Sequence, residues 1–345
     1  MMKWNLAFCS ALLLSCSSKN VKPTTSVNSV TTVVAMESQT WTERGQNRHP
    51  WISQDERYLY FTSGEREHFN HQIYVLDLSS KTQRRLTHQS GDCLQVITIP
   101  NTSQMLYVST TDELKEKNEM DSWAARYLDP KFSRNQVVNK PSEIYLSKLD
   151  GSHIRRLTQS AGFDGQITLH KSGRLAVFVS SRNGRMQLYK LHLSLTAVEP
   201  LYHGKFQDQE PQFSPDGKQL VWTRREIKSD GSFGSAQLYL ATFGKPTVKA
   251  LTTVEADHVS PSWSPDGKSL VFSSDRDRKG QLDLYTLQIE SKCLQKITSQ
   301  SQSVDPLYHP SGKTIFFSQQ QGASFQIQSL PVPAENSQNC LNSPL

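Results

Sequence analysis

A short pattern recurs six times along the 345-residue chain, and this repeat constrains the fold more than any other feature. Each copy has an apolar residue followed by Tyr, with Gln in place of Tyr in the last copy, and an apolar position twelve residues further on. The pairs end at Tyr74, Tyr145, Tyr189, Tyr239, Tyr285 and Gln328, and the later positions are Leu86, Leu157, Leu201, Leu251, Ile297 and Cys340. Successive pairs are separated by 71, 44, 50, 46 and 43 residues. A period near 45 residues is typical of the blades of a β-propeller.

A strand-turn-strand pattern precedes each pair and is sharpest in the fourth and fifth copies. There the turn reads Ser-Pro-Asp-Gly, at residues 214–217 and 264–267. Pro presets φ at the second turn position, Asp suits the third, and Gly accepts the positive φ of the fourth. Each copy therefore holds four short strands. The predicted fold class is all-β: a six-bladed β-propeller of four-stranded blades, in which Cys340 occupies the last apolar position of blade 6.

The long 71-residue step indicates an insertion in blade 2, roughly Thr110 to Pro141. Thr110-x-x-Glu113 matches a capping box, and apolar residues follow at helical spacing until Asp129-Pro130. We therefore predict a helical insertion. It could cover the face of the propeller on which it opens, or simply pack on the rim.

The repeat resembles a known family. The unit Trp-Ser-Pro-Asp-Gly-Lys-x-Leu-x-Phe-x-Ser, followed by Leu-Tyr and Leu-Thr, is similar to the TolB-type propeller repeat, and the resemblance covers about residues 47–345. TolB itself is periplasmic, and an α/β domain precedes its propeller. Here only a Ser/Thr-rich stretch precedes the first blade. The resemblance implies a propeller that binds other proteins, without the partner-binding N-terminal domain of TolB.

The first sixteen residues predict export. Lys3 provides a positive start and Asn5 to Leu14 an apolar core, as in a secretory signal. The sequence Leu13-Leu14-Ser15-Cys16 resembles the bacterial lipobox, in which the Cys is lipidated and becomes the new N-terminus. The alternative is an ordinary signal peptide cut elsewhere.

These features predict the domain organisation: residues 1–15 are a lipoprotein signal peptide, 16–40 a lipid anchor and flexible tether, and 41–345 the propeller. Ser17 after the Cys resembles the sorting pattern of Gram-negative outer-membrane lipoproteins. We therefore expect a cell-envelope location, on the outer membrane and facing the periplasm.

Composition and motifs exclude several classes of function. The net charge of +6 is spread over the chain, and no run of Lys and Arg is interleaved with aromatic residues, so nucleic acid is not an expected partner. The sequence contains no Gly-x-Ser-x-Gly, His-Glu-x-x-His, phosphate-binding or dinucleotide motif. We expect no enzymatic activity and no cofactor. The expected partners are envelope proteins, together with the membrane through the N-terminal lipid.

Three cysteines, Cys93, Cys293 and Cys340, would remain after removal of the signal and lipidation of Cys16. Three thiols cannot all pair within one chain, and at least one is expected to be a buried free Cys.

Polar residues stand where the chain enters the first strand of each blade, and these segments converge on the central channel. The candidate binding residues at the channel mouth are His49, Asp164, Asp208, Glu210, His258 and Asp305. Acids and histidines gathered there could bind a cation or a basic peptide segment. Two alternatives stay open. The side chains could instead satisfy backbone groups. The propeller could also be an enzyme or small-ligand binder with a metal at the channel mouth, as in some carbohydrate lyases and lactonases, relying on His258 or Asp208.

Overall fold

The computed structural model describes residues 37–64, 70–111, 141–299, 302–334 and 340–341. Residues 33–345 form one compact unit. Its described part contains strands and turns but no helix, and therefore no helix of the length and apolar character that crossing a membrane requires.

The strands form six separate sheets of four antiparallel strands each. Blade 1 consists of β2 (Gln46–Ile52), β3 (Tyr58–Gly64), β4 (Gln72–Asp77) and β5 (Gln83–Arg85). Blade 2 consists of β6 (Cys93–Thr98), β7 (Gln104–Ser109), β8 (Glu143–Lys148) and β9 (Arg155–Arg156). Blade 3 consists of β10 (Asp164–Leu169), β11 (Leu175–Ser180), β12 (Gln187–His192) and β13 (Ala197–Pro200).

The second half of the ring follows the same order. Blade 4 consists of β14 (Phe206–Phe213), β15 (Gln219–Glu226), β16 (Gln237–Thr242) and β17 (Val248–Ala250). Blade 5 consists of β18 (His258–Trp263), β19 (Ser269–Ser274), β20 (Asp283–Gln288) and β21 (Leu294–Lys296). Blade 6 combines β22 (Ser303–Tyr308), β23 (Thr314–Gln321) and β24 (Ser324–Pro331) with β1 (Gln39–Thr40) from the other end of the chain.

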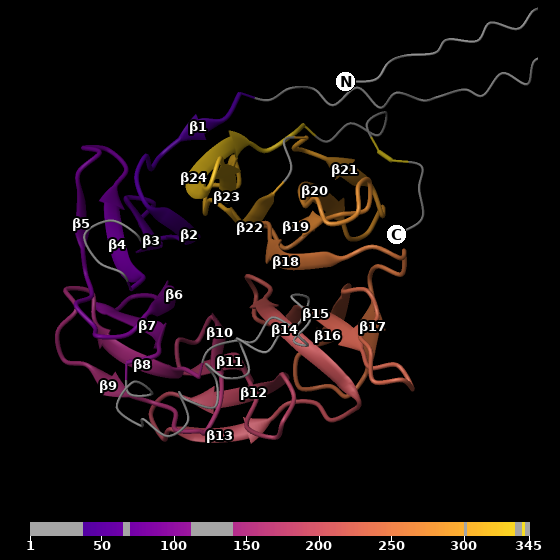
Figure 1. The fold of residues 1–345 in the computed structure, drawn as a ribbon, viewed down its shortest axis with the longest axis horizontal. Helices are drawn as coiled ribbons and strands as arrows, with labels where there is room; N and C mark the ends of the chain where they lie inside the picture. Colours follow the sequence, from indigo (N-terminus) through magenta and orange to yellow (C-terminus); the bar gives the residue numbers. More distant parts are fainter. Residues whose placement is uncertain (1–36, 65–69, 112–140, 300–301, 335–339, 342–345) are drawn as a thin grey trace, which may run out of the picture. The chain divides into compact units, whose positions relative to one another are not determined.

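The six sheets close into a ring (Figure 1). The first strand of each blade contacts the first strands of both neighbours, from β2 through β6, β10, β14 and β18 to β22 and back to β2. These strands surround the centre, and the later strands of each blade lie progressively further out. The predicted six-bladed propeller of four-stranded blades is confirmed.

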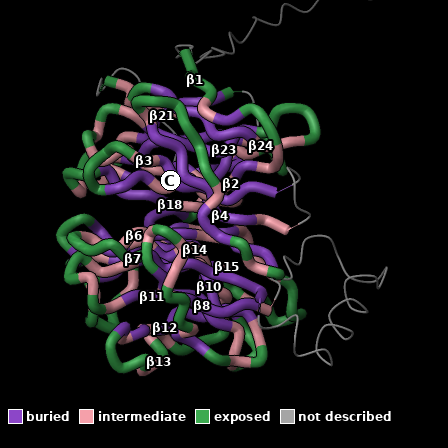
Figure 2. The backbone as a smooth tube through the Cα atoms, turned by 90° about the vertical axis from the view of Figure 1, so that its left-hand side faces the viewer, coloured by how far each residue is buried: buried purple, intermediate pink, exposed green. Residues whose placement is uncertain are grey.

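The core is divided among the interfaces between blades. Six hydrophobic clusters occur, and each combines residues of two neighbouring blades. Between blades 4 and 5, for example, Leu238 and Leu251 pack with Phe272 and Tyr285. Buried backbone fills the interior in side view, and exposed residues concentrate in the peripheral loops and turns (Figure 2). Both faces of most sheets are therefore covered, which explains the short, unalternating apolar runs of the sequence.

The structure gives the repeated sequence pattern a physical reason. In blade 1 the backbone N–H of Leu86 donates to the carbonyl of Ile73, and the hydroxyl of Thr87 accepts from the N–H of Ile73. The same hydroxyl contact occurs at Thr158, Thr252 and Thr298 in blades 2, 4 and 5. In these four blades the Leu-Thr or Ile-Thr pair therefore attaches the outer part of the blade to the strand that carries the Tyr. In blade 3 the N–H of Leu201 donates to the carbonyl of Leu188 in the same way, but Tyr202 stands in place of the Thr.

Blade 6 corrects one expectation. Cys340 does not occupy the last apolar position of that blade. The N–H of Trp41 donates to the carbonyl of Ile327, and the hydroxyl of Thr42 accepts from the N–H of Ile327. Trp41-Thr42 thus takes the place, in blade 6, of the Leu-Thr or Ile-Thr pairs of blades 1, 2, 4 and 5. The spacing of twelve residues misled the prediction because the N-terminal segment, not the C-terminal one, completes this sheet.

Cys340 instead forms a disulfide with Cys293 of blade 5, with 5.1 Å between the Cα atoms. Cys93 is a buried free cysteine, as expected for at least one of the three. Burial raises the pKa of its thiol to about 12, so this side chain behaves as a small apolar residue.

The predicted Ser-Pro-Asp-Gly turns are present. In blade 4 the hydroxyl of Ser214 donates to Asp216, whose carboxylate also accepts from the N–H of Lys218. Gly217 has a φ of +70° and donates its N–H to the carbonyl of Ser214. The Ser264 turn of blade 5 has the same contacts. Each residue type of the motif therefore has a defined structural role.

Several predictions fall outside the described residues. The signal peptide, Cys16 and most of the tether lie there, as do residues 112–140 of the insertion in blade 2 with its predicted helix. These stay predictions. The tether was predicted to extend to residue 40, whereas Gln39 and Thr40 belong to the β1 strand of blade 6.

Candidate functional site

The innermost strand of every blade is interrupted by a β-bulge. A register shift occurs in the pairing of β2, β6, β10, β14, β18 and β22 with the next strand. In five blades the bulge residue has a positive φ near +50°: His49, Gln166, Glu210, Ser260 and Asp305. Gln95 has the corresponding position in blade 2. A bulge redirects a side chain that regular alternation would place elsewhere, so each blade contributes one polar residue to the channel wall.

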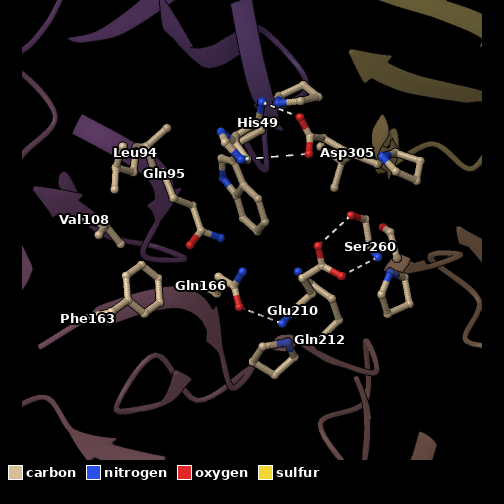
Figure 3. Close-up of a pocket in the computed structure, with 18 residues that line it drawn as sticks. His49, Leu94, Gln95, Val108, Phe163, Gln166, Glu210, Gln212, Ser260 and Asp305 are labelled. Atoms are coloured by element: carbon tan, nitrogen blue, oxygen red, sulfur yellow. Dashed lines mark hydrogen bonds and ion pairs between the residues drawn. The ribbon is translucent and has the colours of Figure 1, made fainter. Parts of the chain in front are cut away.

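These six side chains line a central cavity of about 270 Å³ (Figure 3). A proline follows the bulge residue in four blades, and these prolines also line the cavity. Apolar side chains complete the wall, among them Trp51, Leu94 and Phe163. The cavity therefore combines a mostly apolar surface with a few fixed polar groups, as is usual for binding sites.

Asp305 is the anionic centre of one side of the cavity. The guanidinium of Arg48 donates to both carboxylate oxygens, at 2.5 and 3.1 Å, and the hydroxyl of Ser318 donates at 2.9 Å. Burial by itself would raise the pKa of Asp305, but Arg48, His49 and Ser318 outweigh it and hold the pKa well below its ordinary value. Asp305 is therefore ionised throughout the physiological range.

His49 lies beside this pair, with Nε2 3.9 Å from Asp305 Oδ1, and 42% of its side chain is exposed. Loss of hydration inside the channel lowers its pKa, and Arg48 acts in the same direction against the raising effect of Asp305. His49 is therefore neutral at pH 7 and available as a hydrogen-bonding group.

Glu210 carries the second carboxylate of the cavity. It accepts hydrogen bonds from the backbone N–H of Ser260 at 2.6 Å, from the Ser260 hydroxyl at 2.9 Å and from Thr223 at 2.9 Å. Because Asp305 is matched by Arg48 and His49 is neutral, Glu210 makes the wall net negative.

The same ring of side chains also connects neighbouring blades. The backbone N–H of Glu210 donates to the Gln166 amide oxygen at 3.0 Å, and Gln95 makes two hydrogen bonds to the backbone of Ile167. The contacts of Glu210 with Ser260 and of Asp305 with Arg48 join two further pairs of blades. Several of these side chains therefore do bind backbone groups at the blade junctions, as the alternative interpretation of the sequence expected. The same hydrogen bonds fix the channel wall in position before a ligand binds.

The structure separates the six predicted site residues into two groups. His49, Glu210 and Asp305 line the cavity, whereas Asp164, Asp208 and His258 do not. Each residue of the second group is completely buried at the start of its strand. Asp208 and Glu210 were both predicted at the channel mouth, and residues two apart in a regular strand would share a face. Asp208 is still in regular pairing with Arg224, whereas the bulge begins at Glu210 and turns that side chain to the cavity.

The buried acids pair within their own blades. Arg182 donates to Asp164 at 2.7 Å, and Arg224 donates to both oxygens of Asp208 at 2.7 and 2.9 Å. Trp222 also donates its indole N–H to Asp208. Both oxygens of Asp208 are therefore occupied within blade 4, whereas Asp164 is held through one oxygen and its Oδ1 has no hydrogen-bond partner among the described residues.

His258 has the corresponding position in blade 5, and neither of its ring nitrogens has a hydrogen-bond partner among the described residues. Its ring meets Phe272 edge-on, with 5.6 Å between the centroids. Burial lowers the pKa of His258 to about 4, and the nearby Arg276 adds to the effect. The residue is therefore neutral at physiological pH.

Sequence reasoning missed Gln95, Gln166 and Ser260 because it considered only charged residues and histidine. A signal was available. In four blades the cavity residue is followed directly by Pro, as in Ser260-Pro261, and its position recurs with the repeat. Among the described residues no group of three or more His, Cys, Asp or Glu side chains is placed to hold a metal ion.

Comparison with known proteins places the fold. Residues 227–343 match the family described as TolB beta propeller domain. An uncharacterized protein from Agrobacterium fabrum is 28% identical over 113 residues, which are 32% of this chain and 39% of the relative. The matched region thus spans about two fifths of that curated relative.

Solved structures agree. TolB from Acinetobacter baumannii is 18% identical, with a TM-score of 0.57 over 84% of this chain and 64% of that chain. A putative TolB from Agrobacterium tumefaciens is 15% identical, with a TM-score of 0.61 over 87% of this chain and 100% of that chain. An oligogalacturonate lyase from Vibrio parahaemolyticus is 12% identical, with a TM-score of 0.55 over 85% and 80%. The same propeller architecture therefore occurs in TolB proteins and in lyases.

Proposed function

Because the chain is a TolB-like six-bladed β-propeller, we propose that it is a non-enzymatic cell-envelope lipoprotein whose propeller binds a segment of another envelope protein at the channel mouth. One observation carries this proposal: the ring of six polar residues at or next to the β-bulges, one from each blade, that surrounds the central cavity. A rigid scaffold that presents many side chains around one concave site suits recognition of a protein segment.

The chemistry of the cavity favours a segment with apolar and basic side chains. Trp51, Leu94 and Phe163 offer apolar contact, and Glu210 offers the excess negative charge. Gln95 and Gln166 add amide groups that can bind the backbone of an extended peptide. Because the ring is already fixed by hydrogen bonds between blades, little ordering cost opposes binding.

Affinity purification from crosslinked cell envelopes tests the proposal. We expect the wild-type chain to recover a specific envelope protein. Glu210→Gln keeps the size of the side chain but removes its charge, and should reduce recovery severalfold. Glu199→Gln makes the same change at an exposed ion pair with Lys190 on the rim, and should leave recovery unchanged. If the Glu210→Gln and Glu199→Gln variants recovered equal amounts of the partner, the channel would not be the binding site. If the wild type recovered no specific envelope protein, the proposed interaction itself would be contradicted.

The lipid anchor is proposed from Cys16 and the lipobox-like sequence before it. Cys16→Ala should move the protein from the membrane fraction to the soluble periplasmic fraction, and globomycin should block processing of the wild-type chain. A wild-type protein that is processed normally in globomycin would show that an ordinary signal peptide is used instead.

The alternative of a metal-dependent propeller enzyme draws on the likeness to the oligogalacturonate lyase. It requires metal bound by the purified protein. Metal analysis after gentle purification distinguishes the two functions, because the interaction module needs no ion at the channel mouth.

A further inference from the structure

A second concave surface lies on the rim of the propeller, between blades 6 and 1. We call it the rim groove. It has a volume of about 1320 Å³, and it is lined by residues 39–45 on one side and by residues of β4, β5 and their connections on the other. It shares no lining residue with the central cavity. Its volume exceeds the roughly 300–1,000 Å³ of most small-molecule pockets, so the rim groove can accept several side chains of a bound segment at once.

The rim groove is strongly basic. Arg44, Lys81, Arg84 and Arg85 line it, against the single carboxylate of Glu43. Arg44, Lys81 and Arg84 are exposed, and none of them pairs with a carboxylate of the described residues. Unmatched guanidinium groups are well suited to bidentate binding of carboxylates.

An aromatic and apolar surface lies with these charges. Trp41 is partly exposed, and the ammonium of Lys81 lies 3.5 Å from the centre of its indole ring. The indole N–H donates to Ser329 at 2.8 Å, which fixes the ring. Tyr74 and Leu76 of β4 also line the groove and are buried. A ligand can therefore meet the partly exposed indole of Trp41 together with the cationic groups.

The turn that carries Lys81 is pre-organised. The carboxylate of Asp77 accepts from the backbone N–H groups of Ser79 and Ser80 and from the Ser79 hydroxyl, and Arg57 also donates to it. These hydrogen bonds, led by that of the Ser79 hydroxyl, hold the pKa of Asp77 well below its ordinary value. Lys81 has a φ of +60° within this turn. The ordered turn therefore holds the ammonium group of Lys81 at the groove.

We propose that the rim groove binds an extended acidic segment of a partner protein, in which carboxylates alternate with apolar side chains. Charge complementarity selects an anion, and the volume has room for several side chains of one segment. The concave form disfavours a flat membrane surface, since a planar bilayer cannot follow a groove between two blades to Trp41 and Tyr74. The proposal concerns a different surface from the central cavity and does not depend on the function proposed for it.

Binding of a labelled model peptide tests this proposal. The probe is a fluorescent peptide of about ten residues that alternates Glu and Leu, a length suited to an extended segment in a groove. Anisotropy is measured with the full chain carrying Cys16→Ala, so that no lipid contributes. We expect saturable binding that weakens with salt, and at least about tenfold weaker binding for Arg44→Glu/Arg84→Glu. Lys81→Ala is a milder second variant that should weaken binding in the same direction.

Two controls make the result decisive. Lys218→Glu/Lys268→Glu makes the same charge change at exposed turns of blades 4 and 5, and should leave affinity nearly unchanged. A peptide with Gln in place of Glu should not bind. Equal loss of affinity in the two double variants would overturn the proposal, because it would show nonspecific attraction to a basic protein. So would groove-dependent binding to phosphatidylglycerol vesicles without binding of the peptide.

Discussion

At the scale of single residues, the buried position near the start of the inner strand holds a different type of side chain in different blades. Asp164 and Asp208 are buried there with an arginine partner, whereas His258 is buried with no hydrogen bond to its ring among the described residues. A buried neutral histidine is stable only while it stays unprotonated. Blade 5 should therefore be the acid-sensitive blade.

We predict that acid destabilises the protein through His258. Its folded pKa of about 4 lies below the ordinary value of 6.5, so the unfolded chain binds the proton first as the pH falls. The stabilising contribution is complete above about pH 6.5 and is lost towards pH 4, by up to about 3 kcal/mol. Besides Arg276, the charged groups that act on the ring are Asp257, Asp275 and Lys279.

Urea unfolding between pH 7 and pH 4.5 measures this effect. His258→Asn removes the titrating imidazole. His258→Asp also removes it and places a carboxylate near Arg276, which resembles the Asp–Arg pairs of blades 3 and 4. Both variants should lose less stability over this range than the wild type. The control His153→Asn replaces an exposed histidine and should follow the wild type. Identical pH dependence in all four proteins would refute the role of His258.

At the scale of elements, the Ser-Pro-Asp-Gly turns provide a matched pair for separating backbone strain from steric contact. Gly217 and Gly267 have nearly the same φ, +70° and +71°. A Cβ at Gly267 would have ordinary contact with Pro215 at 3.8 Å, whereas one at Gly217 would lie 2.5 Å from Nε2 of His170. His170 also packs against Phe213 and Phe243, which limits its freedom to move away.

We predict that Gly267→Ala costs about 1–2 kcal/mol of unfolding free energy, the usual cost of a left-handed conformation with a Cβ. Gly217→Ala should cost more, because the contact with His170 adds to the same strain. Thermal or urea unfolding of the two variants provides the comparison. A smaller cost at Gly217 than at Gly267 would mean that His170 moves aside freely.

The same elements show what the sequence could and could not predict. The turns, the Tyr strands and the Leu-Thr pairs were predictable because each depends on local residue types at a fixed spacing. The completion of blade 6 by Trp41 and Thr42 was not, because pairing between the two ends of a chain leaves no periodic signal. In the candidate site, His49, Glu210 and Asp305 were found by charge. The bulge that separates Glu210 from Asp208 was not predicted, because the Pro that follows the bulge residue in four blades is absent from the other two.

At the scale of the whole molecule, the ring is closed from both sides of blade 6. On one side, β1 from the N-terminal part of the chain pairs with β24 of blade 6. On the other side, the disulfide between Cys293 and Cys340 connects the chain after blade 6 to blade 5. Leu341 continues this attachment, since its N–H donates to the carbonyl of Leu294 and its side chain packs on the cluster between blades 4 and 5.

We predict that loss of the disulfide weakens the whole ring. The two cysteines are 47 residues apart, and a loop of this length corresponds to at most about 4 kcal/mol of unfolding free energy. Cys293→Ser/Cys340→Ser should lower the urea midpoint and abolish any further effect of reductant. Cys93→Ala should keep the wild-type response to reductant, because Cys93 is outside the bond. A wild-type midpoint that reductant leaves unchanged would contradict this role.

Closure by β1 has a mechanical consequence. β1 pairs with β24 through only two residue pairs, Gln39 with Ser329 and Thr40 with Gln328. Trp41 and Thr42 hold the next positions by hydrogen bonds to blade 6. If the segment before Gln39 is attached to a membrane, a force that acts on the propeller through a bound partner is transmitted first to the short pairing between β1 and β24. Under tension, β1 should detach from β24 at the outer edge of blade 6 before the interfaces between blades separate.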